Sequence, residues 1–290
     1  MRSAGFAAAK INLFLHVGRL GADGYHPISS LVAFADVGDE LSLRPGVHPD
    51  LVVEGEFAAE LGASGDNLVI KARDRLLAAF DRSTPPFGIR LLKRLPVASG
   101  IGGGSADAAA ALRLIAGLAG MALTDVRVAR IASDLGSDVP VCIASRPSLV
   151  AGRGERLAPP PAFPDLPAVL VNPRRPVFTA AAYRAFDALE LDRTLAPPEP
   201  PPLGSLAAVI DWLGACRNDL QAPAVALEPV IAEVLDRLGA SAGLARLSGS
   251  GATCFGLCDS VAAAKALADA IGVERPDWWV RATVLEGSST

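Results

Sequence analysis

The first half of the chain contains a segment of alternating hydrophobic and polar positions and a long, almost entirely hydrophobic segment. Residues 6–17 alternate with a period of two, which predicts a strand. Residues 87–95 form a second strand-like run, and residues 106–118 are almost entirely apolar and rich in alanine and leucine, which favour a buried helix. The glycine-rich stretch 96–105 lies between these two segments. The pattern therefore predicts a strand, a glycine loop and a helix in direct succession.

The second half of the chain mixes short strands and helices. Strand-like runs alternate with helical stretches, and the runs are 168–171, 245–247, 254–257 and 279–285. A proline-dense stretch, 159–167, precedes them and predicts a boundary between an N-terminal domain, 1–158, and a C-terminal domain, 159–290. This mixed order of elements predicts an α+β fold.

Three expectations concern where strands and helices begin and end. Residues 31–35 and 40–43 are expected to form two strands around a turn at 36–39. Asp66 is expected to cap a helix that runs to about Phe80. Thr124 is expected to cap a helix that ends at Gly136.

The glycine loop has the composition of an anion site. Glycines let backbone N–H groups approach a ligand closely, and the positive end of a following helix favours a phosphate. No lysine follows the glycines as a P-loop requires, and Ser105 and Asp107 stand where a dinucleotide fingerprint requires glycine. The loop is therefore a phosphate-type loop of another kind, and a flexible connecting turn is the alternative.

Several polar residues outside the loop allow two interpretations each. Lys10 and Asn12 either face water on an edge strand or line a charged site. Tyr25 and His26 either anchor a surface turn or offer a stacking ring and a hydrogen-bonding group to a nucleobase. Asp138, before Pro140, either caps a short helix or accepts a hydroxyl proton.

Two further polar features are equally open. Asn67 either meets a ligand or serves the start of its helix. The Ser/Gly loop, residues 248–252, is either a tight hairpin or a second backbone cradle for phosphate.

Composition excludes several classes of protein. A net charge of -4 argues against nucleic acid or an anionic membrane surface as the main partner, but not against a small anionic substrate. The four cysteines show no zinc-like spacing and favour free thiols in a reducing cytoplasm. Lys10 and Asn12 interrupt the apolar run near the N-terminus, which argues against a secretion signal. No uncharged run is long enough to span a membrane.

Three stretches together carry a resemblance. Residues 8–13, residues 96–109 and residues 247–252 resemble the three motifs of the GHMP small-molecule kinases in sequence, order and spacing. Four shorter stretches resemble one branch of that family, which phosphorylates a cytidyl-diphosphate-linked methylerythritol in the non-mevalonate route to isoprenoid precursors. They are residues 22–26, 66–68, 136–140 and 218–220.

The resemblance implies a two-domain fold, with a βαβ-type N-terminal domain, a ferredoxin-like C-terminal domain and the active site in the cleft between them. It implies ATP and Mg²⁺ as cofactors, transfer of the γ-phosphoryl group to the 2-hydroxyl of the substrate, and a monomer or weak homodimer. Lys10 and Asp138 stand at the positions of the family's catalytic pair. Another member of the family, acting on homoserine or mevalonate, is the nearest alternative, and a non-catalytic nucleotide-sensing module is a further one.

The remaining site residues follow from the same resemblance. The ATP-binding positions are Asn67, Pro96, Val97, Ala98, Ser99, Gly100, Ile101, Gly102, Gly103, Gly104, Ser105 and Ala106, with Ser105 also near the metal. The substrate-binding positions are Asn12, Tyr25, His26, Tyr183, Gly249 and Ser250, and Phe178 is the rival of Tyr183 for stacking on the base. The chain departs from the family's usual pattern at Ala8, Gly21 and Asp107, and Asp107 leaves open whether a carboxylate faces the metal.

Overall fold

The structure is a computed structural model that describes residues 4–46, 50–61, 67–79, 85–189 and 194–288. It contains two compact units. Unit 1 comprises Met1–Ala9, Gly38–Val97 and Gly102–Ser145. Unit 2 comprises Lys10–Val37, Ala98–Ile101 and Arg146–Thr290. The domain boundary predicted at residue 158 stays a prediction, since it follows the chain in order and these units do not.

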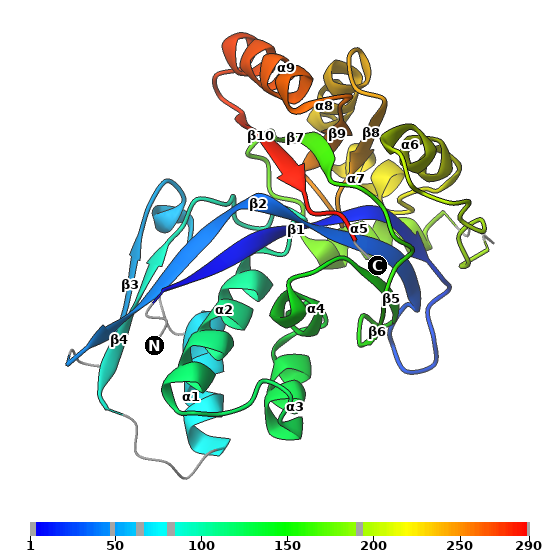
Figure 1. Ribbon diagram of the computed structural model, residues 1–290. Helices are drawn as coiled ribbons and strands as arrows, with labels where there is room; N and C mark the ends of the chain where they lie inside the picture. The colour runs from blue at the N-terminus through cyan, green and yellow to red at the C-terminus, as the bar shows by residue number, and fades with distance from the viewer. Residues whose placement is uncertain (1–3, 47–49, 62–66, 80–84, 190–193, 289–290) are drawn as a thin grey trace. The chain divides into compact units, whose positions relative to one another are not determined.

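The described residues of unit 1 combine a small sheet with four helices. Strand β4 (Phe87–Leu92) pairs in parallel with β3 (Leu51–Glu54) and antiparallel with residues 40–45 of β2 (Ile28–Pro45). A short 3-10 turn, η1, spans Ala58–Glu60. The helices are α1 (Leu68–Ala79), α2 (Gly103–Leu118), α3 (Val126–Leu135) and α4 (Val139–Ala144). The central helix, α2, packs against α1, α3 and α4, and its alanine-rich sequence is buried along most of its length (Figure 1).

Unit 2 is built on an antiparallel sheet. Strand β7 (Leu166–Asn172) pairs with β10 (Trp279–Leu285) on one side and with β9 (Cys254–Leu257) on the other. Strand β8 (Leu244–Leu247) pairs with β9, and β10 meets β2 at Leu285 and Ala35. Strand β5 (Ser148–Gly152) joins residues 28–32 of β2 to β6 (Arg156–Ala158).

Five helices lie in the part of unit 2 that the structure describes. They are α5 (Thr179–Asp187), α6 (Leu206–Ala215), α7 (Gln221–Leu227), α8 (Val230–Gly239) and α9 (Val261–Glu274). Helices α8 and α9 pack on the sheet, where their apolar faces meet β7 and its neighbours (Figure 1). Ser260 caps α9 by accepting a hydrogen bond from the Ala263 amide, 3.1 Å away. Among the described residues, no helix is long and apolar enough to cross a membrane.

Strand β1 (Ala4–Val17) contributes residues 4–9 to unit 1 and residues 10–17 to unit 2, and it pairs with β2. The strand predicted at residues 6–17 is therefore confirmed and begins slightly earlier. The α+β fold class is also confirmed, and the last strand, β10, has the bounds that the sequence predicted.

The turn predicted at residues 36–39 is wrong, because β2 runs through it as one strand. The polar residues there find partners without a turn: Asp36 accepts hydrogen bonds from the Thr283 hydroxyl and the Val284 amide. Gly38 supplies a close approach, since an added Cβ would lie 2.4 Å from the Ala7 carbonyl oxygen.

Two helix starts also differ from the predictions. The cap of α3 is Asp125 and not Thr124, because the Asp125 carboxylate accepts the Arg127 amide at 2.9 Å. Helix α2 begins at Gly103, three residues before the predicted start at Ala106. Asp66, the predicted cap of α1, lies outside the described residues.

Candidate functional site

Three segments that are far apart in the sequence meet in unit 2. The Lys10 amide donates to the Ile101 carbonyl at 2.9 Å, which ties β1 to the glycine loop. The Asn12 amide donates to the Ser248 hydroxyl at 3.2 Å, and that hydroxyl donates to the Gly100 carbonyl at 3.1 Å. One serine therefore joins β1, the glycine loop and the Ser/Gly loop.

The glycine loop and the Ser/Gly loop pack backbone against backbone. The Thr253 amide donates to the Ser99 carbonyl at 3.0 Å. Gly100 and Gly249 have φ angles of 77° and 55°, in the region that favours glycine. Gly100 and Gly249 are therefore required by their backbone conformation.

Lys10 and Asn12 are buried, so the interpretation that they face water on an edge strand is wrong. Each is 4% exposed. The Lys10 ammonium donates to Asn12 Oδ1 at 3.1 Å, and Asn12 Nδ2 donates to the Ser30 hydroxyl at 2.8 Å. Ser30 in turn donates to the Phe14 carbonyl at 2.5 Å. A buried ammonium group on the strand that meets both glycine-rich loops suits an anionic ligand.

Asn12 is fixed in orientation by this network, because its oxygen faces an ammonium group and its nitrogen faces a hydroxyl. Ser30 could not be identified from the sequence, because it lies in an apolar strand four residues after the Tyr-His pair. Only the pairing of β1 with β2 brings it to Asn12.

The aromatic residues lie around His26. Its Nδ1 lies 2.8 Å from the Gly18 carbonyl oxygen and its Nε2 lies 3.3 Å from Asp187 Oδ1, so both ring nitrogens are occupied. The Tyr183 ring centre lies 5.0 Å from that of His26 at a tilt of 37°. Tyr183 thus extends the His26 ring into a short aromatic face.

Tyr25 and Phe178 are both largely exposed, at 56% and 69%. The Arg153 guanidinium lies 4.4 Å from the centre of the Tyr25 ring and also pairs with Asp23 at 2.5 Å. Tyr25 is therefore held by its neighbours on one side while much of its ring remains accessible. Phe178 directly precedes α5, at its N-cap position.

Hydrogen bonds from neighbouring side chains also hold the Ser/Gly loop. Asn218 Nδ2 donates to the Leu247 and Gly249 carbonyls, both at 2.8 Å. The hydroxyls of Thr179 and Ser250 lie 3.0 Å apart. Sequence reasoning had missed Thr179, whose only signal is its place at the start of a helix near the predicted aromatic positions.

In unit 1, the start of α2 presents the expected anion-binding geometry. Gly102 caps the helix in the left-handed conformation, with φ 66° and ψ 19°. The first amides of a helix have no acceptor within the helix, and the helix dipole adds positive potential there. Ser105 lies half-buried in this first turn.

Asp107, for which the sequence left open a role at the metal, is turned toward a buried lysine. Its Oδ2 accepts from the buried Lys93 ammonium at 2.8 Å, and Lys93 also donates to Asp39 at 2.5 Å. Burial raises the pKa of the Asp107 carboxyl to about 7, and the charge of Lys93 opposes that rise. Burial disfavours the Lys93 charge, but Asp107 and Asp39 outweigh it and raise the pKa of Lys93.

Asp138 occupies the N-cap position of α4, but its side chain makes no capping hydrogen bond there. The simple capping interpretation is therefore wrong. The other end of α4 is held by Arg113, which donates to the Cys142 carbonyl at 2.6 Å and to the Phe6 carbonyl at 2.7 Å. Asp138 belongs to unit 1 and Lys10 to unit 2, so their predicted pairing stays a prediction.

Asn67 serves the start of α1, since its Oδ1 accepts the Val69 amide at 2.8 Å. Its side-chain nitrogen takes no part in that bond, so this structural role does not exclude the predicted contact with a nucleotide. The positions assigned to ATP and substrate by resemblance stay predictions.

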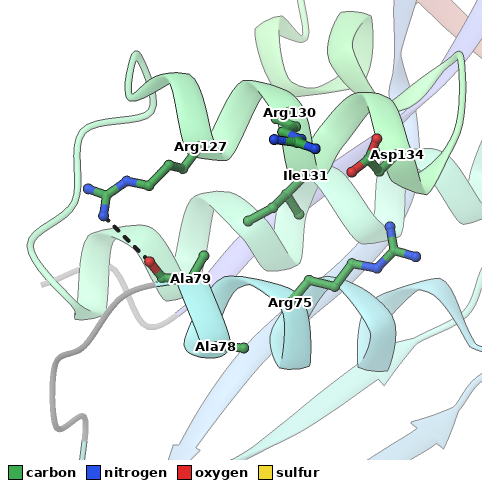
Figure 2. A pocket seen from close by; sticks show the side chains of 7 residues that line it. All are labelled: Arg75, Ala78, Ala79, Arg127, Arg130, Ile131 and Asp134. Carbon is green, nitrogen blue, oxygen red and sulfur yellow. Dashed lines mark hydrogen bonds between the residues drawn. The ribbon is translucent and has the colours of Figure 1, made fainter.

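Unit 1 also has an open hollow of about 810 Å³ between α1 and α3 (Figure 2). Three arginines line it: Arg75, Arg127 and Arg130. Arg127 pairs with Asp125 at 2.7 Å. It also donates to the Ala79 carbonyl, as Figure 2 shows. None of the predicted site residues lines this hollow, and Asp134 offsets part of its positive charge, so it is not the candidate site.

Comparisons with known proteins agree on one family. Residues 67–146 match the GHMP kinases N terminal domain, and residues 202–274 match the GHMP kinases C terminal domain. The chain is 49% identical to 4-diphosphocytidyl-2-C-methyl-D-erythritol kinase of Caulobacter vibrioides (strain NA1000 / CB15N), over 97% of this chain and 98% of that protein. It is 47% identical to the protein of the same name from Methylorubrum extorquens (strain PA1), over 96% of this chain and 97% of the other.

Solved structures give the same result. A crystal structure of 4-(cytidine 5'-diphospho)-2C-methyl-D-erythritol kinase superposes with a TM-score of 0.79 at 33% identity, covering 98% of this chain and 100% of that one. Homoserine kinase from Cytophaga hutchinsonii superposes with a TM-score of 0.71 at 21% identity, covering 99% and 96% of the two chains. The second likeness shows the shared fold alone.

Proposed function

We propose how the residues of this chain carry out the reaction of its family. The chain belongs to the 4-diphosphocytidyl-2-C-methyl-D-erythritol kinases of the GHMP kinase family. The chain is an ATP-dependent small-molecule kinase of isoprenoid precursor biosynthesis. In the proposed reaction, the γ-phosphoryl group of ATP passes to the 2-hydroxyl of 4-diphosphocytidyl-2-C-methyl-D-erythritol.

The observation that carries the proposal is the Ser248 junction. Its hydroxyl bonds the Asn12 amide and the Gly100 carbonyl, and so joins the strand of Lys10 to both glycine-rich loops. A kinase must hold a triphosphate and an acceptor hydroxyl in line, and positioning supplies much of its rate enhancement. A junction of the lysine-bearing strand with two such loops supports this use.

Asp138 is the proposed partner of the acceptor hydroxyl. Its carboxylate would orient the hydroxyl and accept its proton as the O–P bond forms. Lys10 is the proposed electrostatic partner. Its ammonium group favours the ionised form of a nearby carboxylate and stabilises negative charge near the attacking oxygen.

The glycine loop is the proposed cradle of the triphosphate. The α2 amides, from Gly103 onward, would donate to phosphate oxygens, and the glycines allow close approach of the backbone. ADP leaves as the β,γ-bridging oxygen takes the electrons of the broken P–O bond.

Mg²⁺ fits the residues present, as an ion held largely by the nucleotide. The described residues contain no cluster of three or more His, Cys, Asp or Glu that could hold a metal alone. Mg²⁺ commonly binds through substrate phosphates and water with few protein ligands. Ser105 is the proposed protein ligand, since Asp107 is turned toward Lys93. The ion would neutralise charge on the β- and γ-phosphates.

The cytidyl group is proposed to bind near His26. Tyr25 offers an accessible ring, and Tyr183 and His26 form a neighbouring aromatic face. Asn12, Gly249 and Ser250 are proposed to contact the same substrate. Homoserine and mevalonate have no base for these rings to bind.

The four cysteines are free thiols, which is typical of a reducing compartment and supports a cytoplasmic location. We also propose a monomer or weak homodimer, which sedimentation at two concentrations tests.

A coupled ADP-release assay with magnesium and ATP tests the proposed reaction. The acceptor is 4-diphosphocytidyl-2-C-methyl-D-erythritol, and homoserine and mevalonate are run in parallel. Turnover with the cytidyl compound alone is expected. Turnover only with another acceptor would contradict the proposed substrate, and ATP hydrolysis without phosphorylation of any acceptor would contradict the transfer itself.

A further inference from the structure

The two ends of the glycine loop are tied to one buried cluster of charges in unit 1. At the start of the loop, Asp39 Oδ1 accepts the Arg94 amide at 2.6 Å and the Leu95 amide at 2.9 Å. These amides directly precede Pro96. The carboxylate therefore fixes the backbone that leads into the loop.

The same cluster reaches the helix that follows the loop. Lys93 Nζ donates to Asp39 Oδ2 at 2.5 Å and to Asp107 Oδ2 at 2.8 Å. Asp107 lies near the N-terminus of α2, whose first residues form the end of the loop. One ammonium group thus connects the segment before the loop to the segment after it.

We propose that Asp39, Lys93 and Asp107 form a loop clamp that sets the conformation of the glycine loop and, through it, the affinity for ATP. The assignment of the loop to ATP rests on the proposed function. All three residues are at most 3% exposed, so they act through the loop and not by contact with a ligand. They are positioning residues.

Two glycines lie in close contact with Lys93. A Cβ at Gly103 would lie 3.1 Å from Lys93 Nζ, and a Cβ at Gly55 would lie 2.4 Å from the Lys93 carbonyl oxygen. Gly103 therefore lies in tight contact with the ammonium group. Gly55 is needed for the backbone of Lys93 to approach so closely.

Stability alone is a weak reason for such a cluster. Buried ion pairs lose much of their attraction to desolvation, and apolar residues of similar volume often stabilise a core as well. Asp107 Oδ1 is buried with no hydrogen-bond partner among the described residues, which adds a further cost. The charged groups instead provide a specific geometry, because each hydrogen bond fixes one backbone segment at a defined position.

The test compares Asp107→Leu and Asp107→Asn with Ile115→Ala, a control at a buried position further along α2. Asp107→Leu removes the acceptor for Lys93, and Asp107→Asn replaces a charged acceptor with a neutral one. Michaelis constants for ATP and for the acceptor are measured. Hydrogen exchange of the amides in residues 97–104 is measured without ligand, together with ATP binding in the absence of acceptor.

Asp107→Leu is expected to raise the KM for ATP by at least about tenfold, because small misplacements of a binding group carry large costs. Asp107→Asn is expected to raise it by about threefold, since a neutral hydrogen bond is weaker than a charged one. Both variants are expected to speed exchange of the loop amides and to leave the KM for the acceptor within about twofold of wild type. Ile115→Ala is expected to lower the melting temperature and to leave both constants and the loop exchange unchanged.

Equal loop exchange and equal ATP affinity in wild type and Asp107→Asn would overturn the clamp, even if Asp107→Leu does not fold. Equal rises in the constants for ATP and acceptor would also overturn it. ATP binding without acceptor does not depend on which alcohol is phosphorylated. The ATP-binding test would therefore still be valid if the proposed acceptor were wrong.

Discussion

Gly249 lies against Gly100 so closely that neither can carry a side chain. A Cβ on Gly249 would lie 2.6 Å from the Gly100 carbonyl oxygen, and a Cβ on Gly100 would lie 2.4 Å from the Ser248 carbonyl oxygen. Both obstacles are backbone atoms, which cannot rotate away. The contact fixes the glycine loop to the Ser/Gly loop.

We therefore predict that Gly249→Ala lowers kcat/KM by at least about 100-fold, because displacement of the two loops disturbs the alignment of the reacting groups. Gly272→Ala is the control. Gly272 lies within α9 with nothing near its Cβ position, and alanine there is expected to be neutral or to stabilise by about 0.5–1 kcal/mol. Steady-state kinetics and thermal unfolding of both variants provide the measurement. Near wild-type kinetics in Gly249→Ala would show that the loops tolerate separation.

Asp138 is predicted to act in the chemical step and not in ATP binding. Asp138→Asn keeps the size of the side chain but removes its basicity, so kcat should fall by at least about 100-fold, the usual minimum for a general base. The Kd for ATP, measured by calorimetry, should stay within about threefold of wild type. Thermal unfolding should be little changed, since the side chain does not cap α4. Turnover close to the wild-type rate would remove Asp138 from the mechanism.

The local pattern of the chain predicted the glycine loop and the helix after it well. Alternation of polarity identified β1, and Trp279–Leu285 was identified with its observed bounds. These features depend on neighbours within a few residues. The family motifs then placed Lys10 and both loops in one site, and unit 2 shows that their backbones do meet.

The contacts that support the site could not be predicted in this way. Arg246 is buried and donates to the Leu13 carbonyl at 2.8 Å and the Leu213 carbonyl at 2.6 Å. Its partners are backbone atoms, which carry no side-chain signal in the sequence. The loop clamp has the same character, because Asp39 and Lys93 are 54 positions apart and each looks like an ordinary surface charge until β2 and β4 pair.

Tyr25 is predicted to bind the base of the acceptor. Stacking of a base on an aromatic ring is worth about 1–3 kcal/mol, so Tyr25→Ala should raise the KM for the cytidyl substrate by roughly five- to 150-fold. The KM for ATP should change little. Tyr25→Phe should retain most of the affinity, since the ring remains. Equal losses of affinity for both ligands would contradict the stacking role.

Tyr183 and Phe178 are distinguished by the same measurement. The Tyr183 ring already lies beside that of His26. Tyr183→Ala is therefore expected to weaken binding of the cytidyl substrate by a similar factor. Phe178→Ala should leave the KM within about twofold of wild type. A large effect at Phe178 and none at Tyr183 would exchange their roles.

His16 is predicted to make stability depend on pH between 5 and 7. Its ring is buried, with Nδ1 3.1 Å from the Leu195 carbonyl oxygen and Nε2 accepting the Arg217 amide at 3.3 Å, an arrangement that needs the neutral imidazole. Burial lowers the pKa of His16, and the positive charges of Arg217 and Arg246 lower it further, while Asp219 works in the opposite direction. The unfolded chain, where the pKa is near 6.5, therefore binds a proton before the folded chain does.

Because protonation favours the unfolded chain, the free energy of unfolding should fall as the pH drops below about 6.5, by at most about 1.4 kcal/mol per pH unit from this group. His16→Gln cannot titrate and should show a shallower fall over the same range. Urea unfolding of both proteins at pH 5, 6 and 7 isolates the contribution of His16, since the other titrating groups are common to both. Parallel curves would mean that His16 is protonated equally in the folded and unfolded chains, and the neutral hydrogen-bonded ring would then not be its state in solution.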